Sequence, residues 1–186
     1  YDIIKNKFIN KNDNKIDNNN KNKYSVIKSR YGSGKTTFIK KLIENEYLDK
    51  RVIFLTMRQS LARSLHNEFI KYNFVNYLDR EIPVSFETNR IIISIDSLYK
   101  INGFQDNPYD IVICDEFCSL LKHFSFSGIK NQLLTYNIYE DLLLKCHKSY
   151  FLDGDISNRE IIFLKKYFGY IEKPLFNTIV NTKYNF

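Results

Sequence analysis

Alanine and methionine are almost absent from this 186-residue chain, which has one of each, Ala62 and Met57. Asn, Lys, Ile, Tyr and Phe are abundant instead. Codons rich in A and T specify these five residues, so the bias records base composition as readily as function. We therefore expect Phe117, Phe124 and Phe126 to pack in the core rather than to stack on bases.

Cysteine and histidine are scarce, and their spacing excludes the common metal and disulfide sites. Neither the cysteines nor the histidines have the spacing of metal ligands, and an odd number of cysteines cannot all pair in disulfides. Such cysteine usage is typical of a reducing, intracellular compartment. We interpret the histidines as exposed or partly buried helix residues rather than metal ligands. The residues concerned are Cys114, Cys118 and Cys146, together with His66, His123 and His147.

Long apolar runs are also missing. No stretch is long enough to cross a bilayer and none resembles a signal peptide, which excludes a membrane-spanning class and predicts no membrane partner. The location is expected to be intracellular, with cytoplasm and nucleus both open. Because the chain does not begin with Met, we expect Tyr1 to start a fragment or a processed chain.

Acidic residues are outnumbered, 21 against 28 basic ones, for a net charge of +7. This balance favours a polyanionic partner. Residues 1–23 carry six lysines and three aspartates, a net charge of +3, and few apolar residues. Such a segment buries too little surface to offset the entropy lost on ordering. We therefore expect residues 1–23 to be a flexible polar lead-in and residues 24–186 to form one domain.

Short apolar runs alternate with helical patterns from residue 24 onward. The runs are rich in Ile, Val and Leu, as strands buried on both faces of a parallel sheet are. The alternation predicts an α/β fold with a mostly parallel central sheet and helices on both faces. We expect Ile70 to face the core and Asp96 or Ser97 to cap a short helix. The expected strands are 24–28, 51–56, 90–95, 111–114, 149–153 and one in the tail after residue 170, and the expected helices are 36–46, 60–72, the short one after 95, 129–147 and 159–168.

The glycine-rich segment after the first expected strand carries the strongest functional signal. It matches the P-loop, whose glycines turn backbone N–H groups toward phosphate oxygens at a helix N-terminus. Lys35 is expected to bind the β- and γ-phosphates and Thr36 a magnesium ion. Ser29 stands where Gly or Ala is usual, a minor departure. The pattern predicts binding of ATP, or a related triphosphate, with Mg²⁺ through Ser29, Arg30, Tyr31, Gly32, Ser33, Gly34, Lys35, Thr36 and Thr37.

An acidic pair, Asp115 and Glu116, follows the apolar run 111–114. A carboxylate at the end of a buried strand is expected at the sheet edge beside the P-loop. There Asp115 can hold magnesium through water, and Glu116 can orient and activate an attacking water. Such a pair is often only a solvated turn, but a P-loop about 80 residues upstream makes hydrolysis the better interpretation. Lys35, Asp115 and Glu116 are thus the expected catalytic residues.

Two further loops end strands at the same predicted edge. Arg58, Gln59 and Ser60 follow the second strand, and Ser97 follows the third. Arg side chains, hydroxyls and helix N-terminal N–H groups can bind successive phosphates of a nucleic acid strand. Taken alone, each loop fits an ordinary helix cap as well as it fits a nucleic-acid contact. Together they predict nucleic-acid contacts for these four residues.

The order of these segments resembles that of superfamily 2 helicases. GSGKTT, LTMRQSLARSL, SIDSL, ICDEF and YFLDGDIS look like motifs I, Ia, Ib, II and III. Within the superfamily they are most similar to the herpesvirus-type replication origin-binding proteins and their relatives in large DNA viruses and linear plasmids. The resemblance implies a first RecA-like domain that translocates on DNA with ATP during replication. It also implies that Asp153 lies on the strand that senses the state of the nucleotide.

The chain departs from that pattern in two places. Asp153-Gly154-Asp155 stands where Ser-Ala-Thr is common in motif III. This departure affects how ATP hydrolysis would be coupled to translocation. No Q-x-x-G-R-x-x-R-like segment is present, so we expect these residues to lack the second RecA-like domain of the same polypeptide, with its arginine finger. An arginine finger contributes about 10³–10⁵ in rate, so this chain alone is expected to bind ATP and hydrolyse it slowly.

Two other functions stay open on the sequence alone. A nucleoside kinase of the thymidine kinase kind also pairs a P-loop with Asp-Glu, although it normally carries a zinc-binding cysteine lasso that these cysteines cannot form. A non-catalytic nucleotide- or DNA-binding module is compatible with a missing second domain. The intact Lys35, Thr36, Asp115 and Glu116 favour an enzyme. DNA is the expected nucleic acid, but the sequence does not separate it from RNA.

Overall fold

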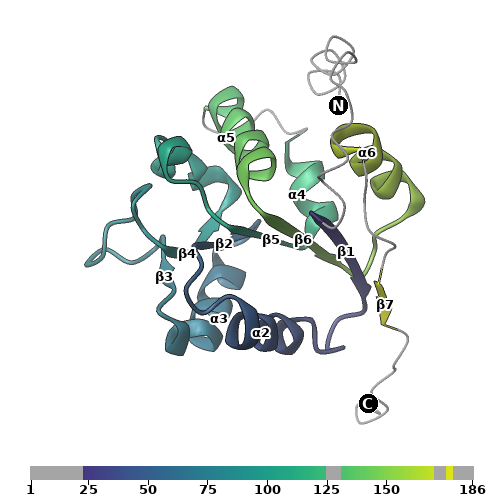
Figure 1. The fold of residues 1–186 in the computed structure, drawn as a ribbon, viewed down its shortest axis with the longest axis horizontal. Coiled ribbons are helices and arrows are strands. Elements are labelled where there is room, and N and C mark those ends of the chain that lie inside the picture. The colour runs from purple at the N-terminus through teal and green to yellow at the C-terminus, as the bar shows by residue number, and fades with distance from the viewer. Residues whose placement is uncertain (1–22, 125–130, 170–174, 178–186) are drawn as a thin grey trace.

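The computed structural model of the chain describes residues 23–124, 131–169 and 175–177. Within these residues, seven strands form one sheet in the order β3-β4-β2-β5-β6-β1-β7, and all the adjacent pairs are parallel (Figure 1). The predicted α/β class with a parallel sheet is confirmed. Of the expected lead-in only Lys23 is described, and its ammonium donates to the carbonyl of Leu144 at 2.7 Å.

The strands follow the apolar runs of the sequence. All residues of β2 and β4 are buried, as are the first four of β5, which agrees with strands covered on both faces. The short β3 is not among the expected strands, whereas β7 lies in the tail as expected. The bounds are β1 Tyr24–Ser29, β2 Val52–Thr56, β3 Val75–Asn76, β4 Arg90–Ser94, β5 Ile111–Asp115, β6 Lys148–Asp153 and β7 Leu175–Asn177.

Helices cover both faces of the sheet. In Figure 1, α2 and α3 lie on one face and α4, α5 and α6 on the other. The helix α6 begins at a capping box made by Ser157 and Glu160. The α-helices are α2 Lys35–Glu46, α3 Gln59–Phe69, α4 Phe117–His123, α5 Gln132–Lys145 and α6 Asn158–Phe168, and the 3₁₀ helices are η3 Ile70–Tyr72, η4 Ile95–Ile101 and η5 Phe104–Asp106.

Two local expectations are wrong. Ile70 is 62% exposed, because α3 ends at Phe69 and the chain tightens into η3, which buries Tyr72 instead. Neither Asp96 nor Ser97 caps the short helix, since η4 already begins at residue 95 and has no side-chain cap. The helix α4 is also absent from the expected elements, although the site depends on it.

Two arginines stabilise the sheet at the end opposite its carboxyl edge. Arg51 precedes β2 and Arg90 begins β4, and each is 9% exposed. The Arg90 guanidinium donates to the carbonyls of Tyr72 and Tyr47, both at 2.8 Å, and to that of Leu48. Arg51 donates to loop carbonyls in the same way. Each buried charge thereby satisfies several backbone acceptors at once.

We expect Arg90→Leu to lower the free energy of unfolding by about 2–4 kcal/mol, since it leaves buried carbonyls without donors. Urea denaturation followed by circular dichroism measures the change. Arg63→Leu, on an exposed position of α3, is the control and should stay within about 0.5 kcal/mol of the unmodified chain. Equal midpoints for the two variants would contradict the role given to Arg90.

Candidate functional site

The parallel register brings the carboxyl ends of the strands to one edge of the sheet. Lys28 of β1 lies opposite Asp153 of β6, and Thr56 of β2 lies opposite Ser94 of β4. Asp115 ends β5, the strand between these two pairs. Loops that follow parallel strands meet at such an edge, where α/β proteins bind their ligands. All the residues that the sequence predicts for the site lie at the ends of these strands, in the loops that follow or in the helices that those loops lead into.

The segment between β1 and α2 has the backbone of a phosphate-binding loop. Gly32 and Gly34 have φ of 72° and 89°, a region that residues with a Cβ rarely adopt. The helix α2 begins directly after Gly34, and no side chain caps its N-terminus. The N–H groups of this first turn and the helix dipole therefore present a positive end to the loop. This geometry suits an anion with several oxygens.

The Lys35 ammonium lies against the loop itself. Its Nζ donates to the carbonyls of Ser29 at 2.7 Å and Arg30 at 3.0 Å. The hydroxyl of the buried Ser29 bonds that of Ser33, which explains how a serine fits where Gly or Ala is usual. Tyr31, at the tip, is fully exposed. A phosphate oxygen would offer Lys35 a charged acceptor in place of two neutral carbonyls, and charge-assisted bonds are the stronger.

Asp115 lies in a partly buried position at the end of β5. Burial raises the pKa of its carboxyl to about 6, and the like charges of Glu116 and Asp153 act in the same direction. The backbone N–H of Glu116, which donates to Asp115 Oδ1 at 3.1 Å, and the charge of Lys35 oppose this rise in the pKa. The side chains predicted for phosphate and for magnesium thus share one electrostatic environment.

Glu116 has an unfavourable backbone and an unsatisfied side chain. Its φ and ψ of 52° and 48° are left-handed, and it stands at the N-cap of α4. Its Oε2 is buried and has no hydrogen bond within the described part of the chain. The Arg58 Nε lies 4.0 Å from this oxygen. Strain and an unsatisfied buried oxygen at one residue are typical of a functional position rather than a stabilising one.

Asp153 ties β6 to two neighbouring segments. Its Oδ2 accepts the backbone N–H of Cys118, in the first turn of α4, at 2.8 Å, and its Oδ1 accepts that of Asp155 at 2.9 Å. Gly154 lies against the P-loop, since a Cβ there would be 3.4 Å from the carbonyl oxygen of Ser29. The Asp-Gly-Asp segment therefore caps α4 and contacts the segment between β1 and α2, two roles that the sequence did not reveal.

The residues predicted for nucleic acid lie at the same edge, on the other side of β5 from the P-loop. Arg58, Gln59 and Ser60 are exposed around the start of α3. Ser97 is half-buried in η4, with its hydroxyl 3.4 Å from that of Ser94. The structure thus separates the predicted residues into two groups, one at β1 and β5 and one at β2 and β4. The contact between Arg58 and Glu116 joins these groups.

One further contact at this edge was not predicted. His123 Nε2 lies 2.7 Å from Asp96 Oδ1, which connects the end of α4 to η4. His66 and His123 lie in helices as expected, whereas His147 follows α5 and its side chain is 82% exposed. Among the described residues, no three His, Cys, Asp or Glu side chains could hold a metal ion, and no helix is long and apolar enough to cross a bilayer.

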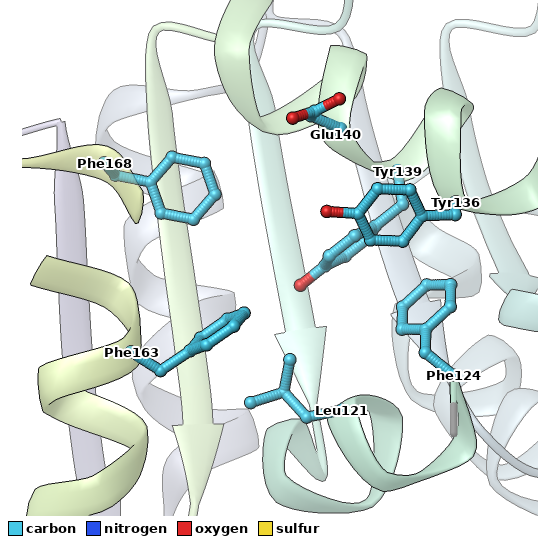
Figure 2. Close-up of a pocket in the computed structure, with 7 residues that line it drawn as sticks. All are labelled: Leu121, Phe124, Tyr136, Tyr139, Glu140, Phe163 and Phe168. Atoms are coloured by element: carbon cyan, nitrogen blue, oxygen red, sulfur yellow. The ribbon is translucent and has the colours of Figure 1, made fainter. Parts of the chain in front are cut away.

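A small apolar pocket lies between α4, α5 and α6 (Figure 2). It does not include a residue of the P-loop or of the loops after β2 and β4, so it is separate from the candidate site. Phe117 and Phe124 are buried, as expected for core residues, and Phe126 lies outside the described residues. The pocket is lined by Leu121, Phe124, Tyr136, Tyr139, Glu140, Phe163 and Phe168.

Comparisons with known proteins identify the family of the chain. The family model described as origin of replication binding protein matches residues 12–169. A protein of Acanthamoeba polyphaga mimivirus described as an uncharacterized helicase is 33% identical over 78% of this chain and 15% of its own length. The replication origin-binding protein of Psittacid herpesvirus 1 is 26% identical over 71% of this chain and 16% of its own length. This chain thus spans less than a fifth of the length of these two relatives.

Solved structures agree on the fold. A DEAD box protein from Methanococcus jannaschii superposes with a TM-score of 0.56, at 18% identity, over 85% of this chain and 46% of that one. At this identity the likeness establishes the architecture alone. It confirms the RecA-like domain that the sequence predicts.

We expect Asp115→Asn to raise the thermal midpoint of the chain at pH 7 without nucleotide. The folded pKa of Asp115 lies above its ordinary value, so the ionised carboxyl disfavours the fold at neutral pH. The contribution of this group to stability is lost as the pH rises from about 4 to about 6. Calorimetry of the variant and the unmodified chain at pH 4 and pH 7 measures their thermal midpoints. A midpoint raised equally at both values, or lowered at pH 7, would contradict the burial argument.

Proposed function

The chain belongs to the origin of replication binding protein family, and we propose that its folded part is the first RecA-like domain of an ATP-dependent DNA helicase acting in replication. The observation that carries this proposal is the position of Lys35, Asp115 and Glu116 at one edge of a parallel sheet, with the charge of Lys35 acting on Asp115. Lys35 alone would support nucleotide binding. The adjacent Asp-Glu pair supports hydrolysis.

The nucleotide is ATP or a related triphosphate in this proposal, held by residues 29–37. The backbone N–H groups around Gly32 and Gly34 would bind the phosphate oxygens, and Lys35 would exchange its two loop carbonyls for the β- and γ-phosphates. Thr36 and Asp115 would hold magnesium. Their hydroxyl and carboxylate oxygens fit this hard cation, and a bound cation would favour the ionised form of the Asp115 carboxyl, whose pKa is raised by burial. Bound magnesium would offset the phosphate charge.

Glu116 is the proposed general base. Its Oε2 lacks a hydrogen bond among the described residues and is held close to the edge by the left-handed turn of its backbone. A carboxylate with a free acceptor oxygen can orient a water molecule and accept its proton. Asp115 is less suited to this task, since its Oδ1 already accepts a backbone N–H.

DNA is the proposed partner of the second group of residues. Arg58, Gln59, Ser60 and Ser97 offer a guanidinium, an amide and hydroxyls of the kind that bind phosphates. The net charge of +7 favours a polyanion, and the name of the herpesvirus relative refers to a replication origin. The rest of the motor, including a second RecA-like domain with an arginine finger, is proposed to lie elsewhere in the same polypeptide.

The nucleoside kinase alternative loses support in the structure. Cys114 lies in β5, Cys118 in α4 and Cys146 after α5, and all three are buried. They do not form a group that could hold zinc within the described residues. Family membership favours the helicase as well.

Lys35→Ala should weaken binding of a fluorescent ATP analogue by at least about tenfold, because it removes the cation that pairs with the phosphates. Fluorescence anisotropy in the presence of magnesium measures the affinity. Lys41→Ala, at an exposed position of the same helix, is the matched control and should bind as the unmodified chain does. Equal affinities for both variants would contradict the assignment of the loop.

The motor function is tested on the full-length protein that contains this domain. Its ATPase rate should rise when single-stranded DNA is added, and the rise should weaken with salt because phosphate contacts are displaced by counterions. Steady-state ATPase assays across a DNA titration measure this. A rate that ignores DNA would contradict the motor, whereas DNA binding that ignores ATP would favour the non-catalytic module. Phosphoryl transfer to thymidine would favour the kinase.

A further inference from the structure

The short helix α4 is held at both of its ends. At its start, Asp153 accepts the N–H of Cys118, and Glu116 forms the N-cap. At its end, His123 bonds Asp96 of η4. Between these points Phe117 and Leu120 are fully buried. Seven helical residues span about 10 Å, so the two ends form a short connection across the edge of the sheet.

Each end of α4 meets a loop that is proposed to bind DNA. Arg58, in the loop after β2, lies 4.0 Å from the Glu116 carboxylate at the start of the helix. Asp96, which bonds the last residue of the helix, immediately precedes Ser97 in η4. The proposed general base and the two DNA loops are therefore joined by a single packed element.

We propose that α4 couples DNA binding to ATP hydrolysis, with Arg58 and His123 as positioning residues that act through Glu116. This inference rests on the proposed function and adds to it the route by which DNA regulates the ATP site. Without DNA, Arg58 competes with the attacking water for Glu116 Oε2, which lies 4.0 Å from its Nε. When a DNA phosphate binds Arg58, the Glu116 carboxylate is released. DNA binding at Ser97 also moves η4, and this movement is passed to Glu116 through His123 and α4.

The contact between Arg58 and Glu116 is weak enough for Arg58 to exchange Glu116 for a DNA phosphate. It is long, and the side chains are 66% and 40% exposed, so the ion pair contributes little stability. A phosphate can accept two parallel hydrogen bonds from the same guanidinium, which makes it the stronger partner. DNA therefore competes effectively for Arg58, and Glu116 Oε2 loses its nearby cation.

The His123 contact is suited to transmission instead. At 2.7 Å it is short, and the His123 side chain is 19% exposed. The buried Phe117 packs its ring 4.7 Å from that of Phe151 on β6, which fixes the body of the helix against the sheet. A shift of Asp96 would then move α4 as a unit, because a packed core does not deform locally.

The first test uses the full-length protein with His123→Ala, Asp96→Ala and the double variant. Each should reduce the DNA-stimulated kcat about fivefold or more, a coupling of ordinary allosteric size. The double variant should lose no more than either single one, since the two residues act through one contact. The DNA-independent kcat and the KM for ATP should stay unchanged in all three variants, and the affinity for DNA, measured by anisotropy, should stay unchanged in His123→Ala. His123→Gln keeps an N–H donor and should recover much of the stimulation.

Control variants and the unmodified protein make the outcomes distinct. His66→Ala, a partly buried histidine of α3, should keep full stimulation. Full stimulation in His123→Ala and Asp96→Ala would overturn the coupling while leaving the proposed function intact, and a parallel fall in the DNA-independent rate would show a merely structural role and overturn it too. An unmodified protein that DNA does not stimulate would overturn both.

A second test addresses the restraint on Glu116. Arg58→Gln should raise the DNA-independent kcat about twofold or more, the size expected when an exposed ion pair of about 0.5 kcal/mol is removed. It should also reduce the further rise caused by DNA. Arg63→Gln, an exposed arginine of α3, is the matched control and should change neither rate. A DNA-independent rate that is unchanged or lower in Arg58→Gln would overturn the restraint.

Discussion

The parallel pairing of β1, β6 and β5 is the constraint on which the rest of this structure depends. A parallel sheet ends all its strands at one edge, so residues about 80 positions apart in the chain, Lys35 and Asp115, come into one electrostatic environment. The strands between them are buried on both faces, which makes a slip of register costly. Isolated P-loop and Asp-Glu segments would have no common geometry. The sheet, which comes from runs of Ile, Val and Leu, creates the site by fixing where its loops begin.

At that edge, three features of the candidate site lower the stability of the fold. Burial raises the pKa of Asp115, Glu116 has a left-handed backbone, and Glu116 Oε2 lacks a hydrogen bond among the described residues. Each feature disfavours the folded chain when it is considered alone. The opposite end of the sheet shows the contrast, since the buried guanidinium of Arg90 is matched to backbone carbonyls. In the proposed function, magnesium would pair with Asp115 and the attacking water with Glu116, so the unmatched groups gather where these partners would bind.

The sequence predicted the sheet and the residues at its edge, but it did not predict which of these residues contact one another. Strand periodicity and the P-loop pattern are local, so the position of Lys35 after β1 followed from neighbouring residues. Ile70 was misjudged because a helical pattern does not show where an α-helix tightens into a 3₁₀ helix. The contacts Asp96–His123 and Arg58–Glu116 join segments distant in the chain, and both depend on α4, which lacks a strong periodic signal. These contacts depend on how the segments pack in three dimensions, which local sequence patterns do not show.

The Asp-Gly-Asp segment shows how one departure from a family pattern can be compensated locally. A serine hydroxyl at residue 153 would reach fewer donors, whereas the two oxygens of Asp153 accept one N–H from α4 and another from their own loop. The longer side chain is followed by Gly154, where a Cβ would come within 3.4 Å of the Ser29 carbonyl. That same carbonyl accepts the Lys35 ammonium. If Lys35 turns to a phosphate as proposed, a shift of the P-loop backbone would press on Gly154 in the loop that caps α4. The segment would then connect the proposed nucleotide site to the helix that carries Glu116.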